Sequence, residues 1–336
     1  MSLKQTITMG DIAALAKVSK PTVSRALNDS PLVNPETKKH VLSIARQYGY
    51  AVNRNAQKLR HKNTDTIGVS IDFGSHRENH ISDPFILELL AGVSEALGNL
   101  NQDLLLCAPR HNDTDSLYHI YSSRGADGFI FLGQGHRMDM LDEFASTGAP
   151  FVVWGAPTKN TDYCVVGSDN LAGGQMAGRY FLERGRRNFL FIGDISHSEI
   201  YWRYKGLQQA VEESGAPVAL NHIALNNFSY ESAFDAADGY LNTADSRPDA
   251  VLAYSDTAAM AFIRLLADRG LKVPEDVSVV GYNDIPAASY FSPRITTVRQ
   301  DTYQAGKLLV SKLMQILDNE NPKSGTIKTE LIVRDT

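Results

Sequence analysis

Residues 11–29, "DIAALAKVSKPTVSRALND", contain two short helical patterns on either side of a four-residue break. Thr8 stands three residues before Asp11, which is the spacing of a capping box, so a first helix is expected to begin there. The apolar side chains expected on the inner face of this helix are Ile12, Leu15 and Ala16. The chain then breaks at Lys17 and Val18.

A second helix is expected after Ser19, which has the residue type of an N-cap. Pro21 fits the first turn, where its missing N–H removes no hydrogen bond. The expected inward stripe consists of Val23, Ala26 and Leu27. The side chains left outside are polar or cationic and suit phosphates and base edges in a major groove; they are Lys20, Thr22, Ser24 and Arg25.

A third helix is expected from the "NPE" stretch at 34–36 to Gly49, with an inner face of Val41, Leu42, Ala45 and Tyr48. Three small helices with a tight break between the first two predict a helix-turn-helix.

Charge supports a nucleic-acid partner. Residues 1–62 hold eleven Lys or Arg and three Asp or Glu, a net charge of +8, whereas the whole chain of 336 residues carries −5, which leaves −13 for the rest.

The stretch "TMGDIAALAKVSKPTVSRALNDSPLVNPETKKHVLSIARQYGYAVNRNAQKLR", residues 8–60, resembles the DNA-binding head of the lactose-repressor (LacI/GalR) family of bacterial transcription regulators. The resemblance places Lys20, Pro21 and Arg25 at base edges. It implies a hinge helix over residues 50–62 that orders on DNA and wedges Leu59 into the minor groove. The resemblance also assigns a set of residues to contacts with the DNA backbone, namely Thr8, Ser24, Asn28, Asn34 and Thr37. Tyr50, Asn53 and Ala56 fall at positions that match the family's hinge helix. Lys17 stands where the family often has Gly, which predicts a non-glycine residue in a left-handed turn.

After residue 62, short apolar runs such as "TIGVSID" and "GFIFLG" alternate with amphipathic helical stretches. This alternation predicts an α/β body of parallel sheets covered by helices. The same family resemblance covers this region, most clearly at residues 167–194 and 250–301. It implies two subdomains similar to periplasmic binding proteins, with a cleft between them. The expected division is 1–49 for the head, 50–62 for the hinge, 63–160 with 292–323 for the first subdomain, and 161–291 with 324–336 for the second.

Polar and aromatic residues follow the predicted strands, where open parallel sheets bind their ligands. The resemblance makes Arg203 the pocket arginine, Phe85 and Phe228 flanking aromatics, and Asn283 the polar group that is commonly Asp. The chemistry of a polar ligand site adds Asp72, Asp83, Trp154, Trp202 and Asp256. For Asp256 a helix N-cap is an equal alternative to a ligand contact.

Other classes of function have weaker support. "GQGHRM" at 133–138 has Met138 where a dinucleotide fingerprint needs its third glycine, and no Walker A loop, nucleophile elbow or His-Glu-x-x-His motif occurs. No enzyme activity, metal or cofactor is therefore predicted. Cys107 and Cys164 are expected to be buried thiols rather than a disulfide or a zinc site.

The chain has no secretory signal and no membrane-length apolar run, so a cytoplasmic protein is expected. The basic head argues against a sugar-binding transport receptor. The hypothesis is a homodimeric repressor of carbohydrate-utilisation genes, bound to a pseudo-palindromic operator and relieved by a sugar. A regulator that depends on a purine-type corepressor is the alternative. The chain finishes at "VRDT" without further apolar heptads, which favours a dimer over a tetramer.

Overall fold

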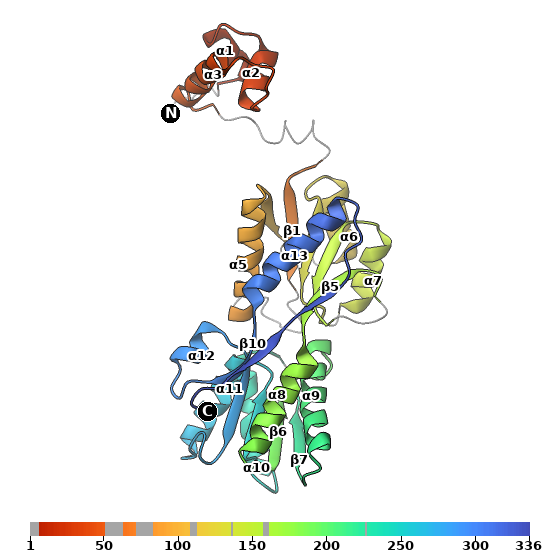
Figure 1. The fold of residues 1–336 in the computed structure, drawn as a ribbon, viewed down its shortest axis with the longest axis vertical. Helices are drawn as coiled ribbons and strands as arrows, with labels where there is room; N and C mark the ends of the chain where they lie inside the picture. Colours follow the sequence, from red (N-terminus) through yellow and green to blue (C-terminus); the bar gives the residue numbers. More distant parts are fainter. Residues whose placement is uncertain are drawn as a thin grey trace. The chain divides into compact units, whose positions relative to one another are not determined.

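The computed structural model describes residues 7–50, 63–71, 83–107, 113–135, 137–156, 161–225 and 227–336. The chain divides into two compact units, Met1–Thr64 and Asp65–Thr336 (Figure 1), and each is described by itself. We call them the head and the body.

The head contains the three expected helices, α1 (Met9–Leu15), α2 (Lys20–Leu27) and α3 (Pro35–Gln47). The capping box is present: the Thr8 backbone N–H donates to Asp11 at 2.8 Å, and Thr8 Oγ1 accepts from the Asp11 backbone. Ser19 caps α2 by accepting from the Thr22 backbone N–H. Lys17 has φ 53°, so the predicted left-handed turn is confirmed on a non-glycine residue.

Two residues expected in the head core lie outside it. Leu15 is 42% exposed and Tyr48 is 48% exposed, whereas Ala13 and Ile44 are buried in their place. Leu15 is the last residue of a seven-residue helix and Tyr48 is the C-cap of α3, so neither has a following turn to hold it inward. Leu27 and Leu42 are half-buried. The core that remains consists of Ile12, Ala13, Ala16, Val23, Ala26, Val41 and Ile44.

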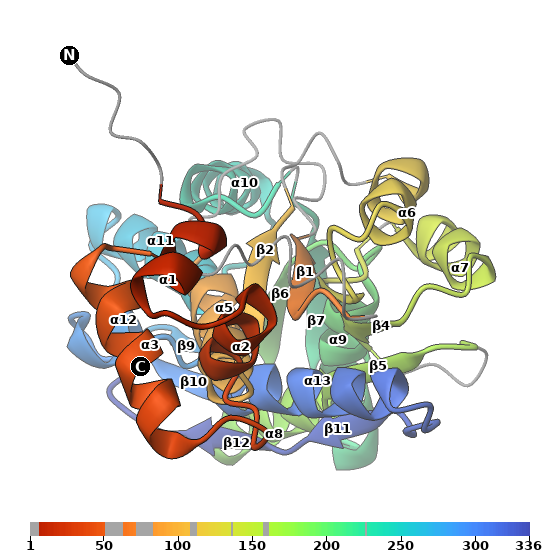
Figure 2. The ribbon, with the colours of Figure 1, turned by 90° about the horizontal axis from the view of Figure 1, so that it is seen from above.

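The first subdomain of the body is built on a parallel sheet in the order β11 (Gly325–Ile327), β5 (Cys164–Ser168), β4 (Phe151–Trp154), β3 (Gly128–Leu132), β1 (Thr66–Ile71), β2 (Asp103–Leu106). Helices α5 (Pro84–Asn99) and α13 (Thr302–Leu317) lie side by side and share one apolar cluster with this sheet (Figure 2). Helices α6 (Thr114–Ser122) and α7 (Met138–Ser146) share another. The sheet is therefore covered on both faces, as parallel strands require.

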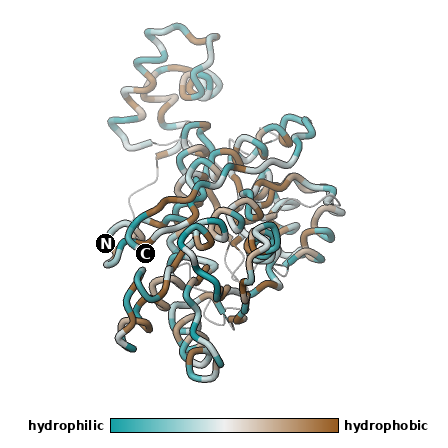
Figure 3. Tube along the Cα trace, turned by 60° about the horizontal axis from the view of Figure 1, so that its bottom comes forward, coloured by the Kyte–Doolittle hydropathy of each residue, from teal (hydrophilic) through white to brown (hydrophobic). Residues whose placement is uncertain are grey.

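The second subdomain has the sheet order β12 (Thr329–Ile332), β10 (Thr296–Gln300), β9 (Ser278–Asn283), β8 (Ala250–Ala253), β6 (Asn188–Ile192), β7 (Ala219–Ile223). All neighbours are parallel except β12, which runs antiparallel to β10. Its helices are α8 (Asn170–Glu183), α9 (Ser198–Ser214), α10 (Tyr230–Thr243), α11 (Asp256–Asp268) and α12 (Pro286–Tyr290). Hydrophobic stretches, brown in Figure 3, alternate along the body with hydrophilic ones.

The expected subdomain boundaries at 161, 292 and 324 are wrong by several residues. β5 pairs with β4 and so extends the first subdomain to Ser168, while β10 pairs with β9 and extends the second to Gln300. β11 still belongs to the first sheet, and the last crossing falls between Ile327 and Thr329. An apolar run shows that a strand forms but not which sheet it joins, because pairing is a long-range contact. The return of α13 to the first subdomain is confirmed.

Both cysteines are free and buried, as the sequence predicts. Burial raises the pKa of the Cys107 thiol to about 11 and also raises the pKa of Cys164. None of the helices in the described ranges combines the length and the hydropathy needed to cross a membrane. Within the same ranges, no cluster of three or more His, Cys, Asp or Glu side chains is placed to hold a metal ion.

Candidate functional sites

The outer face of α2 carries the predicted groove-reading residues. Lys20, Pro21 and Arg25 are exposed, and Thr22 and Ser24 are half-buried. Thr22 has a second role, because its hydroxyl lies 2.8 Å from Ser19 Oγ at the start of the helix. Neither cation forms a salt bridge with a described residue, although the charge of Lys20 acts on Asp11 from a longer distance, so both remain available to a polyanion.

Several of the residues predicted to contact the DNA backbone lie at the ends of helices. Asn34 caps α3 by accepting from the Glu36 backbone N–H at 2.9 Å, and Asn28 is the C-cap of α2. Thr8, Asn28 and Asn34 are exposed, while Thr37 and Tyr50 are half-buried. The hinge residues Asn53, Ala56 and Leu59 lie outside the described residues. Contact of all these residues with DNA stays a prediction.

The second candidate site lies in the body, where the carboxyl ends of the two sheets face each other. Ser198 Oγ at the start of α9 donates to Gln134 Oε1, beyond β3, at 3.3 Å. Ser168 at the end of β5 donates to Gln300 Oε1 at the end of β10. These contacts join the subdomains at the edge where parallel sheets bind ligands.

Arg203 projects from α9 into this region and is 6% exposed. Its Nε donates to Asn170 Oδ1 at 2.9 Å and its Nη1 to the Tyr254 carbonyl oxygen at 2.6 Å. The guanidinium carbon lies 3.8 Å from the centre of the Tyr282 ring. Burial lowers the pKa of Arg203 and raises that of Tyr282 to about 12.

Aromatic rings stand on both sides of the subdomain junction. Phe85 at the start of α5 and Trp154 at the end of β4 have ring centres 6.1 Å apart, and Phe85 packs against the cores of both subdomains. Phe228 lies 5.1 Å from Tyr254 and 4.8 Å from His197. Such rings are suited to packing on the flat faces of a small polar molecule.

Asn283 ends β9 and is buried, and its Oδ1 accepts from Gln300 Nε2 at 2.7 Å. It has φ 106°, and the next residue, Asp284, has φ 58°. Two consecutive residues in this region of backbone space are costly for non-glycine side chains, and strain of this kind is concentrated at functional sites.

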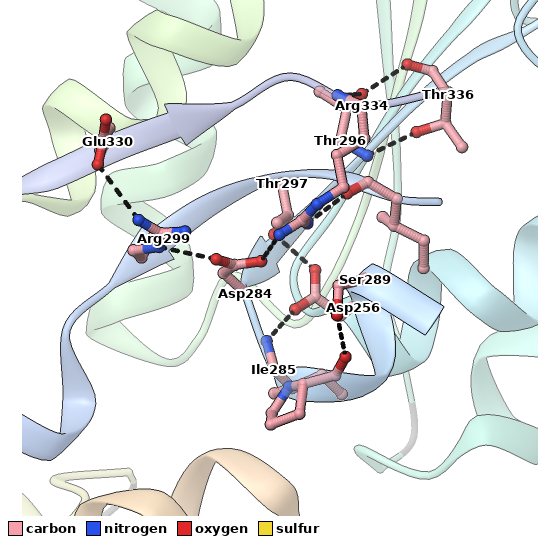
Figure 4. A network of polar contacts seen from close by, with 12 residues as sticks. Asp256, Asp284, Ile285, Ser289, Thr296, Thr297, Arg299, Glu330, Arg334 and Thr336 are labelled. Atoms are coloured by element: carbon pink, nitrogen blue, oxygen red, sulfur yellow. Dashed lines mark hydrogen bonds and ion pairs between the residues drawn. The ribbon is translucent and has the colours of Figure 1, made fainter. Parts of the chain in front are cut away.

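The structure corrects the prediction for Asp256. Ser255, not Asp256, caps α11 by accepting from the Ala258 backbone N–H at 3.2 Å. Asp256 is fully buried (Figure 4): it accepts from Thr297 Oγ1 at 2.5 Å and from the Ile285 backbone N–H at 2.8 Å. Its carboxylate therefore anchors the turn after β9 rather than facing a ligand.

Asp284 is also held by protein partners in this network. Its carboxylate pairs with Arg299 Nε at 2.7 Å and with Arg334 Nη2 at 2.6 Å (Figure 4). The Asp284 side chain is 8% exposed, so its carboxylate is largely shielded from water in both ion pairs. The network ties β9, β10 and the segment after β12 together behind the site.

Two further predicted residues, Trp202 and Asp83, are exposed rather than buried with Arg203. Trp202 is 41% exposed, and its ring centre lies 5.4 Å from that of Tyr201. It is exposed because adjacent positions of a helix face different directions, so position 202 points outward where Arg203 points inward. Asp83 is exposed and caps α5 by accepting from the Phe85 backbone N–H at 3.0 Å. Asp72 lies outside the described residues.

Sequence reasoning missed four residues that surround this site: Gln134, Asn170, Tyr254 and Tyr282. Three of them follow a strand directly or within two residues, so the rule that selected Asp256 would have found them. Tyr282 lies inside β9 and gave no signal, because an aromatic residue within an apolar run is typical of a core position.

The fold and the two sites together define a DNA-binding transcription regulator with a ligand-binding type of body. Residues 8–53 match the model of the bacterial regulatory proteins of the lacI family, and residues 179–336 match a periplasmic binding protein-like domain. The chain is 32% identical to the HTH-type transcriptional repressor PurR of Photobacterium profundum, over 97% of both chains. It is 30% identical to the regulator RegA of Clostridium saccharobutylicum, over 97% of this chain and 98% of that protein. The chain belongs to the lacI family.

Solved structures agree with this assignment. The complex of the transcriptional regulator CelR with cellobiose is 28% identical, with a TM-score of 0.70 over 98% of this chain and 99% of that one. A lac repressor dimer bound to operator and the anti-inducer ONPF has a TM-score of 0.85 over 99% of both chains; at 22% identity it shows the fold alone.

Proposed function

We propose that this regulator is a repressor of carbohydrate-utilisation genes whose affinity for its operator falls when a sugar binds beside Arg203. The observation that carries the proposal is a buried arginine stacked on the Tyr282 ring at the carboxyl ends of two facing sheets. The similarity to a regulator solved with cellobiose supports a sugar. A sugar that binds more tightly to the state of low operator affinity shifts the protein toward that state. The shift in free energy equals the difference between the sugar's binding free energies for the two states, typically about 1–3 kcal/mol.

The test begins with selection of an operator from random duplex DNA by the full-length protein. Operator affinity is then measured by fluorescence anisotropy with and without monosaccharides, disaccharides and purine bases. Weaker operator binding in the presence of one sugar supports the proposal. A response to purines alone contradicts the carbohydrate assignment and favours the corepressor alternative.

Arg25→Ala is expected to weaken binding to the selected operator by about 10- to 100-fold, as the loss of one base-reading arginine does. The same anisotropy titration on operator and on unrelated DNA measures it. Because Arg25 is exposed, the fold of the head should be kept. The matched control is Lys39→Ala, which removes an exposed cation from α3; equal losses in both variants would show that α2 does not read the sequence.

We also propose that two copies pair through the edge strand β2 and helix α5 of the body. Leu87, Leu105 and Leu106 are exposed there, β2 is the last strand of its sheet in the described part of the chain, and an edge strand bearing leucines favours association. Leu105→Glu with Leu106→Glu is expected to shift the protein from dimer to monomer in sedimentation velocity. A double variant that remains dimeric would place the interface elsewhere.

A further inference from the structure

Lys20, the first residue of α2, lies against the first turn of α1. A Cβ added to Gly10 would stand 3.0 Å from Lys20 Cε and 3.4 Å from Lys20 Nζ, so the end of the lysine crosses the bare backbone of Gly10. Non-bonded carbon atoms normally lie about 3.5–4.0 Å apart. A side chain at position 10 would therefore push the ammonium group of Lys20 away from α1.

Asp11, the neighbour of Gly10, attracts the same ammonium group. The pKa of Asp11 is lowered first by its hydrogen bonds from Thr8 and in part by the charge of Lys20. The carboxylate is held in the capping box, where Thr8 Oγ1 donates to Asp11 Oδ2 at 2.7 Å. A fixed negative charge therefore draws Lys20 toward α1, while the lysine itself remains exposed.

The backbone does not require a glycine at position 10. Gly10 is the second residue of α1, and it is not one of the glycines with positive φ. A glycine inside a helix is less favourable than an alanine, because it loses more conformational freedom on folding. The atoms nearest to the missing Cβ belong to Lys20 and Thr8, so the lysine takes up the space that the glycine leaves.

This contact restricts a side chain that is ordinarily flexible. A lysine has four rotatable bonds and loses much of its rotamer freedom when it binds. A lysine that already lies across α1 loses less, and its ammonium group reaches the DNA from one direction. In a major groove, a lysine recognises guanine through O6 and N7. The position of the ammonium group then decides which base pair is read.

We propose that Gly10 is a positioning residue for operator recognition, because the space it leaves fixes the ammonium group of Lys20 at the start of α2, where Lys20 reads a guanine. The inference rests on the proposed function, since it concerns how the same helix reads the operator. Gly10 itself contacts no base and acts through Lys20.

The experiment uses the full-length protein and the operator that it selects from random duplex DNA. Each base pair of the half-site is changed in turn, on both sides of the pseudo-palindrome, and affinity is measured by fluorescence anisotropy. Lys20→Ala is expected to lose about tenfold discrimination at one G·C pair, as removal of a base-reading cation does. The matched control is Lys39→Ala, which removes an exposed cation from α3 and should keep the discrimination at every base pair.

Gly10→Leu is expected to reduce discrimination at that same G·C pair by about 3- to 10-fold and to leave the other base pairs unchanged, because leucine displaces the ammonium group. In a Lys20→Ala background, Gly10→Leu should change no discrimination. Gly10→Ala displaces the lysine less and should give a smaller loss at the same pair, although alanine favours the helix. Thermal unfolding checks the fold of each variant, and Gly10→Ala decides the question if Gly10→Leu does not fold.

Unchanged discrimination in both Gly10 variants would overturn the inference while the proposed function stands. An equal loss with and without Lys20 would also overturn it, because Gly10 would then act independently of the lysine. If Lys20→Ala weakens binding to all sequences alike, Lys20 contacts a phosphate and the inference is wrong. If the protein selects no operator at all, the proposed function fails as well.

Discussion

Gly206→Val is expected to lower the free energy of unfolding of the body by about 3 kcal/mol or more, as overpacking against a rigid neighbour does. Gly206 in α9 faces α8 so closely that a Cβ there would overlap the carbonyl oxygen of Leu171. Gly174 in α8 makes the reciprocal approach, to the carbonyl oxygen of Arg203 itself. The obstacle is backbone in each case, so a rotamer change cannot relieve it.

The same helix contact positions the side chains of the candidate ligand site. The close approach of α8 and α9 brings Asn170 within 2.9 Å of Arg203 Nε, so a spread helix pair should also weaken effector binding. Urea unfolding followed by circular dichroism measures the loss of stability. The matched control is Gly239→Ala in α10, where no atom lies within 4 Å of the added Cβ. That variant should gain about 0.5–1 kcal/mol from helix propensity. Wild-type stability in Gly206→Val would show that the two helices separate at little cost.

Asp256 should make the stability of the protein fall as pH rises from about 4 to about 7. Burial raises the pKa of Asp256 to about 7 from its ordinary value of 3.8, against the opposing effect of its bonds to Thr297 and Ile285. Between these two values the folded state holds the proton and the unfolded state does not. The contribution of this group to the free energy of unfolding therefore drops by about 1.4 kcal/mol per pH unit, about 4 kcal/mol in all.

Asp256→Asn removes this dependence, because an amide does not titrate and still offers an acceptor to the Ile285 N–H and a donor to Thr297 Oγ1. The stability of the variant relative to wild type is expected to rise across that pH range, as measured by urea unfolding at each pH. Asp335→Asn is the control: Asp335 is exposed, and its bond to Arg294 lowers its pKa, so wild type should lose relative stability only as pH falls through the acid range. A flat difference for Asp256→Asn would show that its carboxyl titrates normally.

The placement of the acids shows where prediction from the sequence stopped. Asp256 was expected either to cap a helix or to meet a ligand, and it does neither, because Thr297, 41 positions along the chain, is its partner. Trp202 and Arg203 are adjacent in the sequence, yet only Arg203 turns toward Asn170 and Tyr282. The preference of ligands for the carboxyl ends of parallel strands pointed to the edge at which the two subdomains meet, but which side chains face each other there depends on how the subdomains pack.

The sequence by itself determined the head, because its helices are defined by short-range chemistry: the Thr8–Asp11 box, the Ser19 cap and an apolar spacing of three and four residues. It also determined that the body is α/β with parallel strands. Only the tertiary structure decided that β5 and β10 extend the first and second sheets, and that Asp256 and Asp284 are occupied by protein partners. The physical reason is that strand pairing and the burial of charge depend on residues far apart in the chain, which no local pattern encodes.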